Sequence, residues 1–258
     1  MTKLNNLAIV IPAYKSTFLV AALDSIAVQT CQDFTLYIGD DCSPNNLEEI
    51  VDKYRDKINL VYKRFDTNLG GKDLVAQWER CIDMSQDEEW IWLFSDDDVM
   101  EASCVENFYK SLQETNASYD LYHFDVKVIN DNGKITSIPK KYPQDLDNFS
   151  YYKGKLNGKY ASLVVENIFS REVYQKYNGF KKFDEAYENG VIDRVLTTNL
   201  VYQPEELLSK PWYINVDMSK YMALLIDTLN HDSSISDLLN PVDRIQKRVK
   251  EYNERYTK

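Results

Sequence analysis

The first 115 residues alternate between short apolar runs and segments in which apolar residues recur every three or four positions. A short, nearly unbroken apolar run is typical of a strand buried on both faces of a parallel sheet, and the longer period is typical of a helix packed on such a sheet. The apolar runs predict strands at residues 7–11, 34–39, 58–63 and 90–94. The periodic segments predict helices at residues 17–29, 44–54, 74–82 and 101–114. This alternation favours right-handed βαβ units and a mainly parallel sheet flanked by helices.

The pattern changes after this first half. Residues 120–128 alternate between apolar and polar side chains and precede a turn at residues 130–133, so we expect a hairpin-like element there. Residues 139–160 are rich in Tyr, Lys, Asn, Gly and Pro, which predicts a long surface excursion. Loops of that length in a compact domain often act as functional lids.

The rest of the chain is expected to return to regular structure. Residues 163–178 predict a strand or helix start followed by a helix that ends at Gly179, and the chain beyond Pro211 predicts helices around a polar turn near residues 232–237. The change of pattern near residue 115 also predicts the domain organisation. The expected parts are residues 1–115, a second half of the same domain at residues 116–210, and a helical appendage at residues 211–258.

Composition narrows the class of protein. The chain has 258 residues, of which 44% are hydrophobic and 28% are charged, as in an ordinary soluble globular protein. Its net charge of −11 argues against nucleic acid as a partner, because the phosphate backbone is bound by an excess of Lys and Arg. A small phosphorylated ligand stays possible, since a metal ion can supply positive charge locally.

Cysteine and histidine usage points away from zinc and towards a reducing compartment. Only two histidines occur, and no two cysteines form a C-x-x-C pair, so reduced thiols are expected at Cys31, Cys42, Cys81 and Cys104. The first residues lack the apolar core of a signal peptide, and no apolar run approaches the ~20 residues of a membrane helix. We therefore expect a cytoplasmic protein.

Carboxylates follow two of the predicted strands. Asp40 and Asp41 end the second strand, and Asp96, Asp97 and Asp98 end the fourth. In open parallel α/β sheets ligands bind outside the carboxyl ends of the strands. Clustered carboxylates repel one another and raise one another's pKa, so a hard cation such as Mg²⁺ or Mn²⁺ is the natural occupant. Such an ion would bind a diphosphate and stabilise its charge as it leaves.

These features also have plainer interpretations. The acidic pair at residues 40–41, followed by Ser43 and Pro44, fits a turn with a helix N-cap at Ser43. The acidic run at residues 96–98 is harder to explain as a solvated turn, because aspartate fits strands poorly and is costly to bury unpaired. No G-x-G-x-x-G or Walker pattern occurs, which weighs against dinucleotide oxidoreductases and P-loop enzymes.

Several segments of the first half carry motifs in a fixed order. They are IVIPAY at residues 9–14, LDSIAVQT at 23–30, FTLYIGDDCS at 34–43, NLG at 68–70 and SDDD at 95–98. Together they resemble the IVIPxYN, LDSIlxQT, FEIIIvDDGS, NxG and DxDD motifs of the inverting family-2 glycosyltransferases. Cys42 replaces the usual glycine and Ser95 the first acid of the last motif. The resemblance implies the GT-A fold, a Rossmann-like α/β fold, and a first half that binds the nucleotide sugar.

The resemblance implies a nucleotide site at the ends of the first two strands. The residues that would line the base and ribose are Pro12, Ala13 and Tyr14. Asp41 would accept a hydrogen bond from the base, which suggests uridine and hence a UDP-sugar donor. Lys72 stands where the family often places a basic residue near the nucleotide, although an exposed lysine at a helix start explains it equally well.

The acidic run carries the remaining roles on the donor side. The resemblance places Asp96 near the ribose and pyrophosphate. Asp97 would hold Mn²⁺ or Mg²⁺, with Asp98 beside it.

The catalytic base is expected in the second half. The family follows a GGF turn with an ED pair, and here NGF at residues 178–180 precedes Asp184 and Glu185. An inverting transfer needs a carboxylate that deprotonates the acceptor hydroxyl as it attacks the anomeric carbon. Glu185 or Asp184 would serve, with Glu188 and Asp193 as further candidates. The aromatic-rich helix and the YR…S segment of the family are not recognisable.

The resemblance further implies transfer to a glycan or lipid-linked acceptor in polysaccharide assembly. Residues 243–258 hold six basic and three acidic side chains around a narrow apolar seam, which fits peripheral contact with the inner membrane face or a helix packed on its own domain. Two rival functions stay open. The first is a non-catalytic sugar-nucleotide or glycan-binding module of the same fold. The second is a phosphotransfer domain. Met100 argues against it, because an aspartyl-phosphate motif carries Thr or Val at this position.

Overall fold

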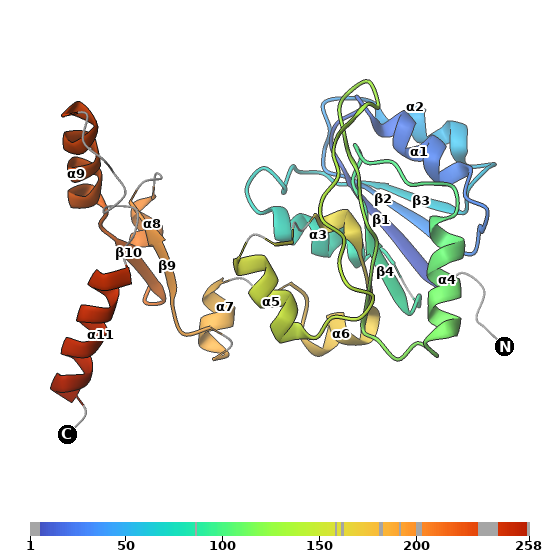
Figure 1. Ribbon diagram of the computed structural model, residues 1–258. Coiled ribbons are helices and arrows are strands. Elements are labelled where there is room, and N and C mark those ends of the chain that lie inside the picture. The colour runs from blue at the N-terminus through green and yellow to red at the C-terminus, as the bar shows by residue number, and fades with distance from the viewer. Residues whose placement is uncertain are drawn as a thin grey trace. The chain divides into compact units, whose positions relative to one another are not determined.

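The computed structural model describes residues 6–85, 87–157, 159–160, 163–180, 183–190, 192–199, 203–231 and 242–256 (Figure 1). Contacts between residues divide the chain into two compact units, Met1–Phe180 and Lys181–Lys258. The first unit contains the six-stranded sheet, and the second contains a two-stranded sheet.

One sheet organises the first unit, with its strands in the order β3, β2, β1, β4, β8, β5. The strands are β1 Leu7–Ala13, β2 Thr35–Asp40, β3 Leu60–Arg64, β4 Trp90–Leu93, β5 Leu121–His123 and β8 Asn167–Ser170. β1, β2, β3 and β4 pair in parallel, whereas β8 runs antiparallel to both β4 and β5. The predicted mainly parallel α/β sheet is confirmed. Since β5 and β8 follow residue 115, both predicted halves contribute strands to this sheet, and their division of roles stays a prediction.

β1 lies in the interior of the sheet, between β2 and β4, which explains its continuous apolar sequence. Pro12 in this strand has no N–H to donate. The carbonyl of Val10 accepts from the N–H of Phe94 at 2.8 Å, so β1 faces β4 at this position. Pro12 faces the same side two residues later, beyond the last residue of β4. The missing N–H therefore leaves no ladder bond unmade.

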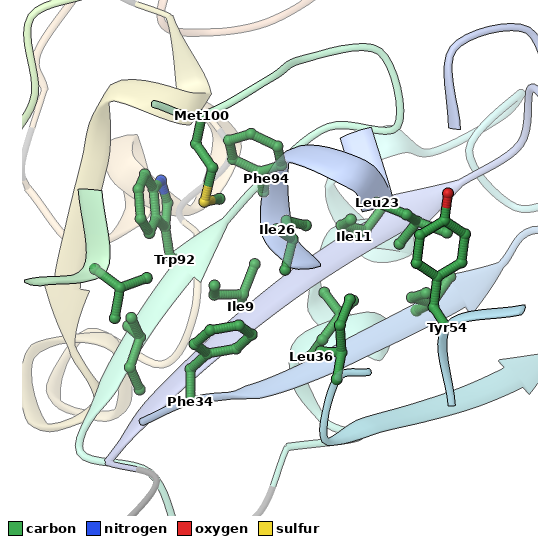
Figure 2. Packing of buried hydrophobic residues seen from close by; sticks show 14 of the residues in the cluster. Ile9, Ile11, Leu23, Ile26, Phe34, Leu36, Tyr54, Trp92, Phe94 and Met100 are labelled. Carbon is green, nitrogen blue, oxygen red and sulfur yellow. The ribbon is translucent and has the colours of Figure 1, made fainter. Parts of the chain in front are cut away.

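Helices cover both faces of the sheet. Those packed on the first face are α1 (Leu19–Ala27), α2 (Leu47–Val51) and α4 (Cys104–Glu114), and those on the second are α3 (Leu74–Ile82) and α6 (Arg171–Lys176). Alternate side chains of β1 point to opposite faces of the sheet, and each face has its own cluster of buried apolar residues. Ile9 and Ile11 belong to the cluster on the first face, shown in Figure 2, and Ala8 and Val10 belong to the cluster on the second. Ile9 is fully buried, so truncation to alanine would cost about 2–5 kcal/mol of folding free energy.

The segment between α4 and β8 is more regular than its composition suggests. Its elements are β6 (Val128–Ile129), β7 (Ile135–Ser137), α5 (Asn148–Leu156) and the 3₁₀ helix η2 (Val164–Glu166). β6 and β7 form an antiparallel hairpin across the predicted turn, which is confirmed. The alternating stretch at residues 120–128 does not form one arm of that hairpin, because its first part is β5 and pairs with β8. The surface excursion predicted at residues 139–160 contains α5, whose start is capped by Asp147 accepting from the N–H of Ser150.

The second unit alternates short helices with two strands. Its elements are α7 (Phe183–Glu188), β9 (Val195–Thr198), α8 (Glu205–Leu208), β10 (Tyr213–Val216), α9 (Ser219–Asn230) and α11 (Val242–Tyr256). β9 and β10 pair in parallel. The chain beyond Pro211 therefore begins with a strand, and the prediction of helix alone was wrong there. The polar turn expected near residues 232–237 lies outside the described residues.

All four cysteine thiols are free, and burial raises the pKa of the Cys81 thiol to about 12. Among the residues that the structure describes, no helix is both long enough and apolar enough to cross a membrane.

Candidate functional site

The carboxyl ends of β1, β2 and β4 meet at one edge of the sheet because these strands are parallel neighbours. We call this edge the rim and define it as residues 12–15, 40–43 and 95–98. Direct hydrogen bonds join its parts: the N–H of Asp41 donates to the carbonyl of Ala13 at 2.8 Å, and the Ser43 hydroxyl donates to the carbonyl of Tyr14 at 2.6 Å. The structure thus brings the two acidic segments of the sequence to one edge.

Asp96 is a buried rim residue that fixes the loop after β1. Its Oδ2 accepts hydrogen bonds from the backbone N–H groups of Tyr14 at 2.8 Å and Lys15 at 2.9 Å. Burial raises the pKa of this carboxyl, and the two N–H donors oppose that rise. Asp96 therefore holds the end of β1 against the end of β4. Its predicted place beside the ribose and pyrophosphate stays a prediction.

Asp97 and Asp98 present carboxylate oxygens at the end of β4. Asp97 is exposed and accepts a hydrogen bond from the Ser95 hydroxyl, whereas Asp98 is half-buried. Burial, followed by the negative charges of Asp97 and Asp96, raises the pKa of the Asp98 carboxyl.

This donor set fits a hard divalent cation. Among the described residues, no group of three or more His, Cys, Asp or Glu side chains is arranged to hold a metal ion. Mg²⁺ is usually bound through one or two carboxylates plus the phosphates of a substrate, and does not require a cage of protein ligands. Asp97 and Asp98 offer two such carboxylates, and a cation beside them would offset their mutual repulsion.

Asp41 is buried, and its carboxylate organises the turn after β3. Oδ1 accepts from the N–H of Leu69 at 2.7 Å, and Oδ2 accepts from the N–H of Gly70 at 2.8 Å and the side-chain amide of Asn68 at 3.0 Å. Arg80 donates a further hydrogen bond to Oδ1. A carboxylate has about four acceptor positions, and all are used here. A nucleotide base would have to displace one of these donors, so the predicted base contact of Asp41 stays a prediction.

The close approach of Asp41 explains the glycine of the predicted turn. A Cβ atom at Gly70 would lie 2.7 Å from Oδ2 of Asp41, closer than van der Waals contact allows. Any larger residue would push the turn away from the carboxylate. The NxG motif is therefore a docking motif between this turn and β2.

Arg80, on α3, contacts the rim residue Asp41 and was missed by sequence reasoning. It projects from α3, its guanidinium carbon lies 3.9 Å from the centroid of the Phe65 ring, and it also donates to the carbonyl of Thr67 at 3.0 Å. Stacking on the Phe65 ring and pairing with Asp41 place one positive charge beside the buried Asp41 carboxylate. The only signal in the sequence is a basic residue in the last turn of a predicted helix, which is a common surface feature.

Asp40 has a structural role in the turn after β2, as in the plainer interpretation of the acidic pair. It is fully buried and accepts from the Tyr62 hydroxyl and the Arg64 guanidinium, each at 2.7 Å, and from the N–H of Ser43. Its charge is thus neutralised inside the protein. The helix N-cap predicted at Ser43 was wrong. The Ser43 hydroxyl accepts from the N–H of Asn45, and α2 begins only at Leu47.

Cys42 adopts a left-handed backbone conformation, with φ at +54°. That conformation is costly for a residue with a Cβ atom and easy for glycine. The structure therefore explains why the family motif has glycine here, and it shows that this chain retains the turn with a strained residue.

A pocket of about 250 Å³ opens beside the acidic run. Its polar lining comes from Ser95 and Asp98, and its apolar lining from Pro12, Trp78, Leu93, Phe94, Leu163, Val164 and Val165. The indole N–H of Trp92 donates to the carbonyl of Val165 at 2.7 Å and holds that wall on the sheet. The pocket thus combines the end of β1, the end of β4, helix α3 and the segment before β8.

A family model described as glycosyl transferase family 2 matches residues 8–177. The match includes β1 to α6 and therefore the whole rim and pocket. The chain belongs to glycosyl transferase family 2. The resemblance found in the sequence is confirmed, and the members of this family are glycosyltransferases.

Individual relatives agree with this family 2 membership. The chain is 31% identical over 130 residues to the poly(ribitol-phosphate) β-N-acetylglucosaminyltransferase TarS of Staphylococcus aureus. That match covers 49% of this chain and 21% of TarS, so the chain spans about a fifth of the length of this relative.

Solved structures share the fold. Residues 1–349 of S. aureus TarS in complex with UDP-GlcNAc superpose with a TM-score of 0.52 at 21% identity, over 67% of this chain and 47% of that one. The mannosyltransferase PcManGT from Pyrobaculum calidifontis, solved with GDP-Man and Mn²⁺, gives a TM-score of 0.50 at 14% identity, over 70% and 48%. These likenesses confirm the GT-A fold predicted from the sequence.

The family 2 turn at residues 178–180 is anchored on α3 within the first unit. The N–H of Phe180 donates to a carboxylate oxygen of Glu79 at 2.9 Å, and a Cβ atom at Gly179 would lie 2.3 Å from the same oxygen. Gly179 also has a φ of +81°. Glycine is therefore required here for space and for backbone conformation, and Glu79 is another residue that the sequence did not reveal.

The candidate bases of this family 2 member lie in the second unit. Asp184 accepts from the Lys210 ammonium at 2.8 Å and the Trp212 indole N–H at 2.7 Å, and these bonds lower its pKa. Glu185 is exposed on the same helix, and Glu188 and Asp193 are exposed further along the chain. Which of them is the base stays a prediction.

The remaining predicted nucleotide contacts differ in accessibility. Tyr14 is 42% exposed at the rim, and Pro12 lines the pocket. The Ala13 side chain is fully buried, so only its backbone reaches the rim. Lys72 is exposed just after the turn that Asp41 holds. The roles of all four stay predictions.

Proposed function

We propose that the protein transfers a sugar, with inversion, from a UDP-sugar to a glycan or lipid-linked acceptor, assisted by Mn²⁺ or Mg²⁺. The observation that carries this proposal is the position of Asp97 and Asp98 at the carboxyl end of β4, beside both the loop after β1 and the pocket. Ligands of open α/β sheets bind at this place. Residues 116–210 would supply the acceptor side.

The proposed donor is a UDP-N-acetylhexosamine. The support comes from TarS, which is described as a β-N-acetylglucosaminyltransferase and was solved with UDP-GlcNAc. The uridine would lie over residues 12–14 and the Asp41 turn. The diphosphate would lie towards Asp96, whose carboxylate keeps the Tyr14 and Lys15 backbone in place.

Asp97 and Asp98 would hold the cation in this proposal. The cation supplies positive charge that neutralises the diphosphate as it departs. Support comes from the adjacency of these two carboxylates at the end of β4 and from the Mn²⁺ in the PcManGT complex.

Glu185 is the proposed general base. An inverting transfer needs a carboxylate that takes the proton of the acceptor hydroxyl. Asp184 is a poorer choice, because its bonds to Lys210 and Trp212 stabilise the ionised form and lower its basicity. Glu185 is the next carboxylate along α7 and is exposed.

Hydrolysis of the donor tests the proposal without knowledge of the acceptor. Excess protein incubated with UDP-GlcNAc and Mn²⁺ is expected to release UDP slowly, because a working leaving-group site transfers sugar to water in the absence of an acceptor. EDTA should abolish the release. If the protein bound UDP-GlcNAc but released no UDP, a non-catalytic binding module would replace the proposed enzyme.

A further inference from the structure

The pocket beside the rim is too small for a whole nucleotide sugar. Its volume of about 250 Å³ lies below the roughly 300–1,000 Å³ of pockets that enclose drug-sized ligands. It can therefore hold only one part of the donor. Two of its walls, Leu163 and Val164, keep 42% and 47% of their surface exposed, so that a ligand there would cover apolar side chains.

The lining indicates which part of the donor it holds. Of the residues proposed to contact the base, only Pro12 lines the pocket, whereas Ala13, Tyr14 and the residues of the Asp41 turn do not, so most of the proposed base site lies outside it. Asp98 does line it, which places the pocket next to the proposed diphosphate site. The group that follows the diphosphate in a nucleotide sugar is the sugar ring.

The pocket is unusually apolar for a sugar. Apart from Ser95 and Asp98, its lining is apolar, with the Trp78 indole on one side and residues 163–165 on another. A bare hydroxyl that enters such walls loses water without gaining a partner, whereas a methyl group gains from burial. A sugar that carries an acyl-amino group fits this lining better than one that carries only hydroxyls.

We propose that Trp78 and residues 163–165 form a subsite for the acyl-amino group of the donor and determine the preference for an N-acylated sugar. This inference rests on the proposed function, because it concerns the same donor. Both walls are held in place from behind: Trp78 packs edge-to-face on Phe180, with ring centroids 5.9 Å apart, and Trp92 holds the carbonyl of Val165. A pocket fixed in this way discriminates because its walls do not rearrange around a smaller sugar.

Calorimetric titration of three ligands in the presence of Mn²⁺ tests the subsite. The ligands are UDP, UDP-glucose and UDP-N-acetylglucosamine, and the dissociation constant of each is measured. The wild type is expected to bind the N-acetylated donor roughly tenfold more tightly than UDP-glucose. Trp78→Leu should reduce that ratio to about one and leave the affinity for UDP unchanged.

Two further variants complete the test. Val164→Thr keeps the shape of the wall and adds a hydroxyl, so it should also lower the ratio of the two affinities. This variant tests the subsite even if Trp78→Leu disturbs folding. Leu74→Ala changes an exposed leucine on the same helix, outside the pocket, and should leave the ratio at the wild-type value. An unchanged ratio in both Trp78→Leu and Val164→Thr, with UDP still bound, would overturn the subsite alone. Failure of the wild type to bind UDP would overturn the proposed function together with the subsite.

Discussion

The carboxylate of Asp41 accepts from the N–H groups of Leu69 and Gly70, and that of Asp96 accepts from Tyr14 and Lys15. At the residue scale, both side chains therefore shape the loops on which a nucleotide would lie. A buried carboxylate with several donors is hard to replace, because removing its charge leaves donors with weaker partners. Substitution at either position is expected to act on stability as well as on ligand binding.

Asp41→Asn should lower the free energy of unfolding by about 2 kcal/mol and weaken UDP binding, since an amide cannot accept from all four donors. Urea denaturation and UDP titration measure the two effects. Asp66→Asn is the matched control, because Asp66 is exposed and the change of charge is the same. Wild-type stability and UDP affinity in Asp41→Asn would show that the carboxylate neither holds the turn nor contacts the base.

Cys42→Gly should stabilise the first unit by about 0.5–1 kcal/mol, because it relieves the left-handed conformation at a φ of +54°. Cys31→Gly is the matched control. Cys31 has no positive φ, so the same chemical change should be destabilising there. Chemical denaturation compares the two variants, and a loss of stability in Cys42→Gly would contradict the strain argument.

At the scale of elements, α7 carries two neighbouring carboxylates in different environments. Lys210 and Trp212 hold the pKa of Asp184 below its usual range. A carboxyl with a lowered pKa stabilises the fold above its unfolded-state pKa, near 4, and this contribution is lost as pH falls through the lowered value. We thus expect Asp184 to contribute to the free energy of unfolding of the second unit mainly above pH ~4.

Glu185→Gln should abolish sugar transfer and leave UDP binding unchanged, because a general base acts on the acceptor. Asp184→Asn should retain transfer, since in this account Asp184 pairs with Lys210. A radiolabelled-donor transfer assay and UDP titration separate the two effects. If Glu185→Gln transferred at the wild-type rate, the base would lie elsewhere, and Asp193 would be the next residue to test.

Helix α11 presents exposed Val249 and Tyr252 among basic side chains. A basic amphipathic helix of this kind is drawn to anionic bilayers, and salt screens that attraction. We expect co-sedimentation with anionic vesicles at low salt and its loss at high salt. Lys247→Glu combined with Arg248→Glu should remove the binding. No binding at low salt would show that the helix instead packs within its own unit with a solvated basic face.

At the scale of the whole molecule, the sequence predicted best what depends on local pattern. β1, β2 and β4 are buried on both faces, so they appear as continuous apolar runs, and the acidic rim follows from where they end. β10 was missed because its exposed face leaves no such run.

Contacts between segments that are distant in the sequence could not be predicted from the local pattern of residues. Arg80 meets Asp41 across 39 positions, and Trp78 lines one pocket with residues 163–165. Nothing local marks such pairs, because a tryptophan or arginine on a helix has the same sequence signature whether or not it faces a site. The sequence therefore predicted that the acidic segments at residues 40–41 and 96–98 lie at one edge of the sheet, but it did not predict the pocket beside them.

Thermal unfolding with UDP, in Mn²⁺ and in EDTA, tests the central claim most directly. A ligand that binds only the folded protein at about 100 times its dissociation constant adds about 2.7 kcal/mol, which should raise Tm by roughly 5 °C. EDTA should remove most of this shift, and so should Asp97→Asn. Asp96→Asn should retain more of it, because one amide oxygen can still accept both N–H groups that now meet Oδ2. An equal shift by UDP in Mn²⁺ and in EDTA would contradict the account.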